Sequence, residues 1–420
     1  MPSRLKVLSC LTMFLFVPAM ISAQLTHGKK PVLPAPYATK SSANSPSKVS
    51  PPEGFLPTVP AGFKINVFAT GFKRPRWLIV APNNDIFVAD TGAGDIDVLR
   101  DSQNNGGAQS REKFATGLTR PFGIAFHDDY VYVGTMKQLV RFKYDPKTSK
   151  RLGEAEPLLA LPGGGHDTRS VVVSKDGKHV FVGVGSESNV SPGEEPIRAA
   201  VTICDPDGKN ARLFATGLRN PVGLALEPAT GKLWTSVNER DELGDNLPPD
   251  YFTSLKDGGF YGWPYSYIGD NVDARVKPQR PDLVAKAIVP DVLLGSHVAP
   301  LQFAFYTGQQ FPESYRGGAF VAEHGSWNRS VRAGYEVIRV PMHQTGRASG
   351  EYEDFVTGFV VDNGHVWGRP VGITVAPDGS LLVTDDGSNS IWRISYTGAK
   401  AQKSASELKH ASNTAKSASN

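Results

Sequence analysis

The feature that most constrains this chain is a unit that recurs along its length. Phenylalanine, alanine or valine, threonine and glycine follow one another in four places, residues 68–71, 114–117, 214–217 and 355–358. After each copy comes a proline with an apolar run, then a turn and a second apolar run. Paired apolar runs around a short turn predict β-hairpins. The chain therefore consists largely of repeated hairpins.

Two diverged copies complete the series. One begins at Ser170 and the other at Pro300, and each has a glycine-containing turn before its second apolar run. Six units spaced by about 45 to 70 residues match the four-stranded blades of a propeller. We therefore predict an all-β fold, a six-bladed β-propeller over residues 59–397, in which Phe63 to Ala69 seals the last blade to the first. A β-sandwich is the alternative, but it does not account for the repeats.

The segments outside the repeats differ in composition. Residues 1–23 join a charged start to an apolar run and a small-residue cleavage site, which predicts a signal peptide and a periplasmic or secreted protein. The run is too short for a membrane anchor, so no integral span is expected after cleavage. Residues 24–58 and 398–420 are rich in small and polar residues without apolar periodicity, which predicts a disordered lead-in and a disordered tail.

Charge and cysteine content exclude several classes of function. The net charge of +4 is spread along the chain without a basic run, so nucleic acid is not an expected partner. Signal cleavage would leave Cys204 as the single cysteine, which cannot form an internal disulfide. The sequence contains no CxxCH motif, so no covalently attached haem is expected.

Loops that precede the inner strands of a propeller converge on its axis, and here they carry polar residues. His166 follows three glycines, which allow close approach to a ligand, and its imidazole can accept a proton, although such a histidine is more often a turn hydrogen-bonder. Arg219 and Asn220 offer donors that suit carboxylate or quinone oxygens, and equally a salt bridge between blades. Arg329 and Arg369 on the same predicted face favour an anionic ligand.

Residues 238–251 concentrate carboxylates and carbonyls in a loop that also contains glycine and proline. Hard oxygen ligands of this kind suit Ca²⁺, although the spacing is not that of an EF-hand. A solvated acidic loop is the alternative interpretation. The aromatic and glycine-rich run 258–264 indicates a packed structure there, which favours the ion site.

Four motifs, in order along the chain, resemble the glucose/sorbosone dehydrogenase family, and most closely its sorbosone dehydrogenase branch. They are Gly217-Leu-Arg-Asn-Pro221, Asn238-Glu-Arg-Asp-Glu-Leu-Gly-Asp245, Tyr261-Gly-Trp-Pro264 and His324-Gly-Ser-Trp-Asn-Arg329. The resemblance covers roughly residues 60 to 397. It implies a six-bladed propeller that oxidises a sugar, sugar aldehyde or related alcohol with pyrroloquinoline quinone (PQQ) and Ca²⁺, and that passes electrons to an external acceptor.

The resemblance also implies roles for single residues. His166 matches the general base, which takes the hydroxyl proton of the sugar while hydride moves to the quinone. Arg219 and Asn220 match the pair that hydrogen-bonds the quinone oxygens. Arg329 and Arg369 fall near positions that bind the cofactor carboxylates or lie over its ring.

The same resemblance implies two ions in the 239–246 segment. The backbone carbonyls of Glu239 and Arg240 fall where the family holds the cofactor's Ca²⁺. Asp245 and Asn246 fall where it holds a second, structural ion. All four are therefore metal-ligand candidates.

The chain departs from the glucose-oxidising members in the partner of the base. Those members have a carboxylate about twenty residues beyond the histidine that orients it, whereas Ser186 stands here, next to Glu187. Unless Glu187 substitutes, the base loses its orienting partner, and glucose is not the expected substrate. Two other functions remain open, a Ca²⁺-dependent lactonase-type propeller hydrolase, which needs an ion held by side chains on the axis, and a non-catalytic binding propeller.

Overall fold

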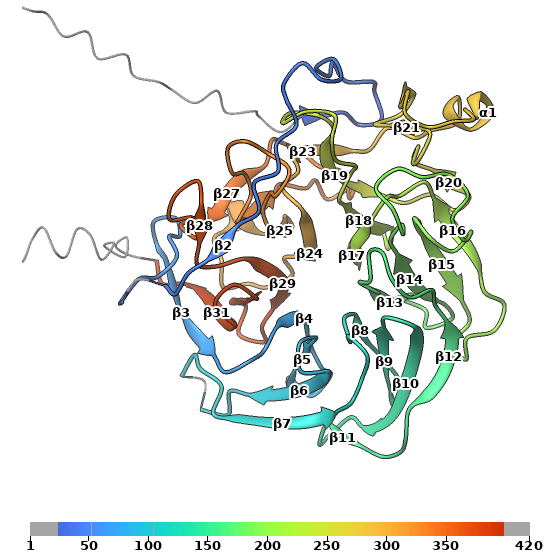
Figure 1. Ribbon diagram of the computed structural model, residues 1–420. Helices are drawn as coiled ribbons and strands as arrows, with labels where there is room; N and C mark the ends of the chain where they lie inside the picture. The colour runs from blue at the N-terminus through green and yellow to red at the C-terminus, as the bar shows by residue number, and fades with distance from the viewer. Residues whose placement is uncertain (1–23, 52, 104, 399–420) are drawn as a thin grey trace, which may run out of the picture.

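The computed structural model describes residues 24–51, 53–103 and 105–398. The predicted signal peptide and the tail from residue 399 lie outside these residues. Six antiparallel-based sheets form a ring around a central axis (Figure 1), which confirms the predicted all-β, six-bladed β-propeller. Among the described residues, helix is limited to α1 (Pro281–Val284) and a 3₁₀ turn at Glu313–Tyr315. None of the helical segments found there has the length and apolarity to span a bilayer.

The first three blades follow one another along the chain. The first contains β4 (Pro75–Val80), β5 (Ile86–Asp90), β6 (Asp95–Arg100) and β7 (Ser110–Ala115). The second contains β8 (Ile124–His127), β9 (Tyr130–Thr135), β10 (Gln138–Asp145), β11 (Lys150–Arg151) and β12 (Glu156–Ala160). The third contains β13 (Val171–Val173), β14 (Val180–Val184), β15 (Ala200–Cys204), β16 (Arg212–Thr216) and, parallel to β16, β20 (Gly259–Phe260).

The other three blades include strands that come from distant parts of the sequence. The fourth contains β17 (Pro221–Leu226), β18 (Leu233–Val237), β19 (Pro249–Ser254), β23 (Val292–Ser296) and β1 (Gln24–Leu25). The fifth contains β24 (Pro300–Phe305), β25 (Ala319–Glu323), β26 (Glu336–Val340) and β27 (Glu353–Val356). The sixth contains β29 (Pro370–Val375), β30 (Leu381–Asp385), β31 (Ser390–Tyr396) and β3 (Phe63–Ala69). Two small pairs lie outside the blades, β2 (Ser47–Lys48) with β28 (His365–Val366), and β21 (Ser266–Tyr267) with β22 (Asn271–Val272).

Ring closure occurs as the sequence predicts. Strand β3 pairs with β31 in antiparallel register, Phe63 opposite Tyr396, so the last blade receives its outer strand from the beginning of the propeller. Phe63 is buried, and its ring contacts those of Phe311, Tyr315, Phe355 and Tyr396 with centroids about 5 Å apart. Edge-to-face aromatic packing of this kind adds to area burial, so closure is anchored by the core as well as by the strand ladder.

Glycine in the repeated inner strand is explained by contact between neighbouring blades at the axis. A Cβ added to Gly372 would lie 2.2 Å from the carbonyl oxygen of Arg76 in the next blade, and one on Gly223 would lie 2.4 Å from that of Leu301. Backbone atoms of a neighbouring sheet cannot yield as a flexible side chain can. Thr384 Oγ1 also donates to the Arg76 oxygen at 2.5 Å. Glycine therefore recurs in the repeat because adjacent inner strands approach each other closely at this position.

The prediction of a disordered lead-in is wrong for the part of residues 24–58 that the structure describes. Strand β1 pairs with β23, β2 pairs with β28, and Thr58 bridges to Thr357. Figure 1 shows this segment crossing the ring in front of the fourth to sixth blades. The segment has no periodic apolar pattern. It is held by hydrogen bonds to the loops of other blades and by Leu25, Leu33 and Leu56, which pack against the core. Hydropathy periodicity does not register contacts of this kind.

Candidate active site

A cavity of about 260 Å³ lies among loops of the third to sixth blades. Its ionisable lining distinguishes it from a larger cavity of about 400 Å³, whose walls are mainly the inner strands and include no ionisable side chain. The smaller cavity is lined by His166, Arg219, Asn238, Glu239, Asp241, Asp250, His297, Ala299, His324, Gly325, Trp327 and Arg369. Three of the five residues predicted to bind or react with the ligand, His166, Arg219 and Arg369, therefore share one cavity.

His166 is held in one orientation by Ser186. The backbone N–H of His166 donates to the Ser186 carbonyl oxygen at 2.9 Å, and its Nδ1 lies 2.8 Å from the same oxygen and 3.1 Å from Ser186 Oγ. Since the Ser186 hydroxyl donates to the Ser188 carbonyl, both Ser186 oxygens act as acceptors towards the ring. Nδ1 therefore carries the proton, and Nε2 keeps its lone pair.

The environment keeps this imidazole neutral. Burial, reinforced by the positive charge of Arg219, lowers the pKa of His166 to about 4. Gly185 packs against the histidine, since a Cβ there would lie 2.5 Å from His166 Cβ and 2.4 Å from Asn220 Oδ1. The ring is thus an oriented, unprotonated base across the neutral range.

Glu187 does not replace the missing carboxylate partner of this histidine. Its side chain is 63% exposed and lies 3.9 Å from Arg198 Nε, where it forms a long ion pair. The orienting partner is instead the backbone carbonyl of Ser186, which no sequence motif marks. The base therefore keeps an orienting acceptor, but that acceptor is uncharged.

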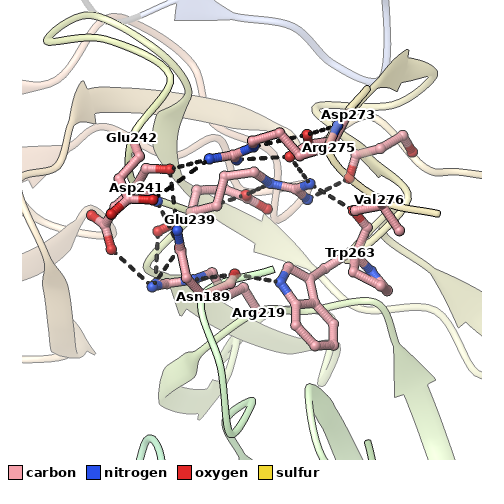
Figure 2. Close-up of polar contacts among 12 residues, drawn as sticks. Asn189, Arg219, Glu239, Asp241, Glu242, Trp263, Asp273, Arg275 and Val276 are labelled. Atoms are coloured by element: carbon pink, nitrogen blue, oxygen red, sulfur yellow. Dashed lines mark hydrogen bonds and ion pairs between the residues drawn. The ribbon is translucent and has the colours of Figure 1, made fainter. Parts of the chain in front are cut away.

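All five N–H donors of Arg219 are used within the protein, and Figure 2 shows how Asn189, Glu239 and Asp241 surround it. Nε donates to the Asn189 carbonyl oxygen and Nη2 donates to Asn189 Oδ1, both at 3.1 Å. Nη1 reaches the carbonyls of Asn238 at 3.4 Å and Glu239 at 2.8 Å, and Nη2 also reaches Asp241 Oδ2 at 2.9 Å. Arg219 could donate to a ligand only by releasing one of these partners. Its charge still faces the cavity.

Asn220 adjoins the cavity through Asn238. Its Nδ2 donates to Asn238 Oδ1 at 3.1 Å, while its own Oδ1 is buried and has no hydrogen-bond partner among the described residues. Arg329 is not brought to the cavity lining. Its Nη1 lies 3.4 Å from the Ser296 carbonyl oxygen, and burial lowers its pKa despite the nearby charge of Asp245.

Arg369 presents the open guanidinium of the cavity. Its Nε donates to the His324 carbonyl at 3.1 Å and its plane lies over Tyr335, 5.7 Å from the ring centroid. Within the described part of the chain, no hydrogen bond engages its two terminal nitrogens. Burial lowers the pKa of Arg369, with Asp386 opposing the shift. A partly buried cation with free donors in a cavity is suited to an anionic group.

Two further histidines line the cavity: His297, which the sequence places among the polar residues of loops facing the axis, and His324, for which the sequence predicted no role. His297 Nδ1 lies 3.5 Å from Asp241 Oδ1 and its Nε2 lies 3.0 Å from the Gly244 carbonyl. Burial opposes its protonation, but the hydrogen bond to Asp241, the charge of Asp250 and the Gly244 carbonyl together outweigh burial, so the pKa of His297 is raised. His324 Nε2 lies 2.7 Å from Asp386 Oδ1. Burial and Arg369 nevertheless lower the pKa of His324 to about 3.

A signal for both histidines existed in the sequence. His297 precedes an inner strand, as His166 does, and His324 opens one of the four family-like motifs. Their acidic partners, Asp241 and Asp386, are distant in sequence from the histidines that they contact. Only the fold brings these pairs together, so they were missed.

The four metal-ligand candidates do not converge as a set of side chains. The Arg240 guanidinium is fully buried among Glu239, Asp273 and the carbonyl of Pro264. Asp245 accepts hydrogen bonds from the backbone N–H and the hydroxyl of Ser330. Asn246 Oδ1 is buried without a partner among the described residues.

No group of three or more His, Cys, Asp or Glu side chains in residues 24–51, 53–103 and 105–398 is arranged to hold a metal ion. Glu239 presents its carbonyl to Arg219, which leaves that oxygen a second lone pair. Backbone carbonyls can also ligate Ca²⁺, so the predicted ion site in the 239–246 segment stays a prediction.

Comparison with known proteins was made by sequence and by fold. A family model described as TrAA12-like matches residues 57–249 and 276–397. An uncharacterized protein of Borreliella burgdorferi is 30% identical over 356 residues, which cover 80% of this chain and 90% of that protein. A PQQ-dependent pyranose dehydrogenase of Coprinopsis cinerea is 24% identical over 414 residues, covering 82% of this chain. The match spans only 55% of the length of the Coprinopsis protein.

Solved structures share the fold. The holo form of the pyranose dehydrogenase PQQ domain from Coprinopsis cinerea has a TM-score of 0.70 at 22% identity, covering 82% of this chain and 98% of that one. A calcium structure of a Trichoderma reesei carbohydrate-active enzyme of family AA12 has a TM-score of 0.72 at 19% identity, with the same coverages. At these identities the likeness concerns the propeller itself.

Proposed function

Because this chain belongs to the TrAA12-like family, we propose that it is a quinoprotein oxidoreductase that oxidises a sugar, sugar aldehyde or related alcohol with PQQ as its cofactor. A PQQ-dependent sugar dehydrogenase of Hypocrea jecorina is also similar, at 23% identity over 332 residues. The observation that carries the proposal is one cavity that holds an oriented neutral imidazole, His166, and an open guanidinium, Arg369.

The cavity fits an anionic quinone. PQQ carries carboxylates, and Arg369 offers such an anion terminal N–H groups that have no hydrogen-bond partner among the described residues. The volume of about 260 Å³ is slightly below the ~300–1,000 Å³ range of small-molecule sites. When bound, PQQ would supply the two-electron acceptor for the hydride that leaves the sugar carbon.

His166 is proposed as the general base. The Nε2 lone pair would accept the hydroxyl proton as the C–H bond of the same carbon breaks, and Nδ1–H would remain on the Ser186 carbonyl. The imidazolium formed in this step would be less stabilised by the carbonyl than by a carboxylate. Arg219 would disfavour it further. Both effects favour rapid return of the proton to solvent.

Arg219 and Asn220 are proposed as cofactor-site residues with different tasks. Arg219 fixes the Glu239 carbonyl and Asp241 and gives the cavity positive charge, and it could reach a quinone oxygen by exchanging its 3.4 Å bond to Asn238. Asn220, whose Oδ1 is buried and unpartnered, remains a ligand-contact candidate. Arg329 is proposed to act at the rim, where it faces Asp245.

Calcium is proposed as a second component of the site. The carbonyls of Glu239 and Arg240 are the candidates for the cofactor-associated ion, and Asp245 and Asn246 for a structural one. The unpartnered buried Oδ1 of Asn246 is an acceptor that a cation would satisfy. A lactonase-type hydrolase would need an ion held by side chains, and the described residues contain no such cluster.

Localisation and electron transfer complete the proposal. The composition of residues 1–23 favours export to the periplasm or the exterior, and PQQ would be reoxidised by an external electron acceptor.

The test of the proposed function is titration of the purified apo-protein with PQQ and Ca²⁺. Reduction of a redox dye then reports oxidation of each member of a panel of sugars and aldehydes. Saturable PQQ binding with sugar-dependent dye reduction is expected. Absence of PQQ binding at micromolar concentrations would overturn the proposal.

A further inference from the structure

Residues 37–49, which we call the strap, cross the loops that form the wall of the cavity (Figure 1). The strap precedes the region matched by the TrAA12-like family, which begins at residue 57. The strap therefore lies outside the part of the chain that the family model matches. Its contacts fall on three regions of the propeller's loops.

The first contact region is the segment that contains the metal-ligand candidates. Tyr37 donates its backbone N–H to the Leu243 carbonyl at 2.8 Å. The backbone N–H groups of Gly244 and Asp245 donate to Ser41 Oγ and Thr39 Oγ1, both at 2.9 Å. The carbonyl of this same Gly244 contacts Nε2 of the cavity residue His297. The strap thus fixes the backbone that orients a cavity histidine.

The second contact region is the loop that carries Trp327. Asn44 donates its backbone N–H to the Trp327 carbonyl at 2.7 Å and its side-chain Nδ2 to the Ser330 carbonyl at 3.2 Å. In return, Arg332 donates to the Asn44 carbonyl at 3.0 Å. Trp327 lines the cavity and its side chain is 44% exposed, so its position depends on this loop.

The third contact region comprises β28, in the connection from the fifth blade to the sixth, and Asp386, in the β30–β31 loop of the sixth blade. Strand β2 of the strap pairs in parallel with β28, and Lys48 Nζ donates to the Asp386 carbonyl at 3.2 Å. The carboxylate of Asp386 holds His324 in the cavity wall. Three walls of one cavity, from the fourth, fifth and sixth blades, are therefore tied together by thirteen consecutive residues, 37–49.

We propose that the strap is a positioning element for the cofactor cavity, and this inference rests on the proposed PQQ-dependent function. The loops that it joins have no shared strand ladder, and their direct contacts with one another are a few hydrogen bonds, such as those from Ser330 to Asp245 and from Glu242 to Asn328. Without the strap, fewer contacts would fix their relative positions. A ligand would then have to order them on binding, and affinity falls when a site is not preorganised. Because the strap already makes these contacts in the free protein, the ligand would not have to order the loops when it binds.

The test uses the full chain with the strap loosened by Thr39→Val, Ser41→Ala and Asn44→Ala together. PQQ affinity in the presence of Ca²⁺ should fall at least about tenfold, measured by quenching of tryptophan fluorescence. In the apo-protein, amide exchange should accelerate at residues 243–246 and 327–332, while the inner strands keep their protection. Lys30→Ala, which removes an exposed lead-in ion pair with Asp270, is the matched control and should change neither quantity.

A conservative variant separates positioning from general stability. Thr39→Ser with Ser41→Thr keeps both hydroxyl acceptors and should retain wild-type affinity and exchange. Unchanged PQQ affinity in the triple variant, or unchanged exchange at residues 243–246 and 327–332, would overturn the proposal. A wild-type chain that binds no PQQ would overturn the proposed function, and the exchange arm would then still decide whether the strap orders the cavity wall.

Discussion

Replacing His166 by alanine tests the proposed chemistry most directly. The substitution removes the Nε2 lone pair but leaves the backbone bond from residue 166 to the Ser186 carbonyl, so the loop should keep its place. Loss of a positioned general base typically lowers rates by 10²–10⁴-fold, about 3–5 kcal/mol of barrier. One neutral hydrogen bond, from Nδ1 to Ser186, is also lost, and such a bond contributes only ~1 kcal/mol. The rate should therefore fall far more than the stability or the PQQ affinity.

The assay follows single-turnover oxidation of a sugar substrate at saturating PQQ, with PQQ affinity measured on the same samples. Added imidazole should partly restore the rate in His166→Ala, because the truncation leaves space at the base position. His365→Ala is the matched control, since His365 is half-exposed and pairs with Asp362 away from the cavity. A variant that keeps more than about a tenth of the wild-type rate would refute the base assignment.

Three further outcomes follow from the same geometry. Gly185→Ala should lower PQQ affinity and turnover together, because its Cβ would push against both His166 and Asn220; wild-type kinetics would contradict the packing argument. Saturating Ca²⁺ should raise the melting temperature by roughly 5 °C, since a ligand that binds only the folded chain stabilises it, and identical melting curves with a chelator would count against the ion site. Stability should decline as the pH falls from ~6.5 to about 4, because the pKa of His166 is lowered in the folded state and the unfolded chain takes up the proton first; His166→Ala should weaken this decline in denaturant titrations across that range.

The fold was predictable because its unit is local and repeated. Each hairpin signal, such as the run before and after Gly231, lies within a few residues, and six copies leave few alternative architectures. The lead-in was not predictable in the same way. Its order depends on hydroxyls and amides, such as those of Ser41 and Asn44, that bond to loops hundreds of residues away.

The sequence predicted several residues of the candidate site, but it did not predict which groups they would contact. His166, Arg219 and Arg369 could be named because motifs place them before inner strands. The sequence did not show that protein acceptors use all the donors of Arg219, or that the Ser186 carbonyl orients His166. Both contacts depend on where backbone atoms lie, which side-chain identity does not reveal. Asp386 lies in the sixth blade and His324 follows a strand of the fifth, so no local sequence pattern predicts their contact.

Closure of the last blade by β3 sets a condition on the order of folding. Phe63 is synthesised near the start of the chain, yet its partner Tyr396 is among the last residues of the propeller. Until the chain is complete, β3 has no sheet to join, and its row of unpaired backbone groups is exposed to other chains. Pairing over such a separation is slow because the connecting loop must first be closed. Because the chain is synthesised from its amino terminus, the interval between the synthesis of the two ends is therefore the period of greatest risk of aggregation.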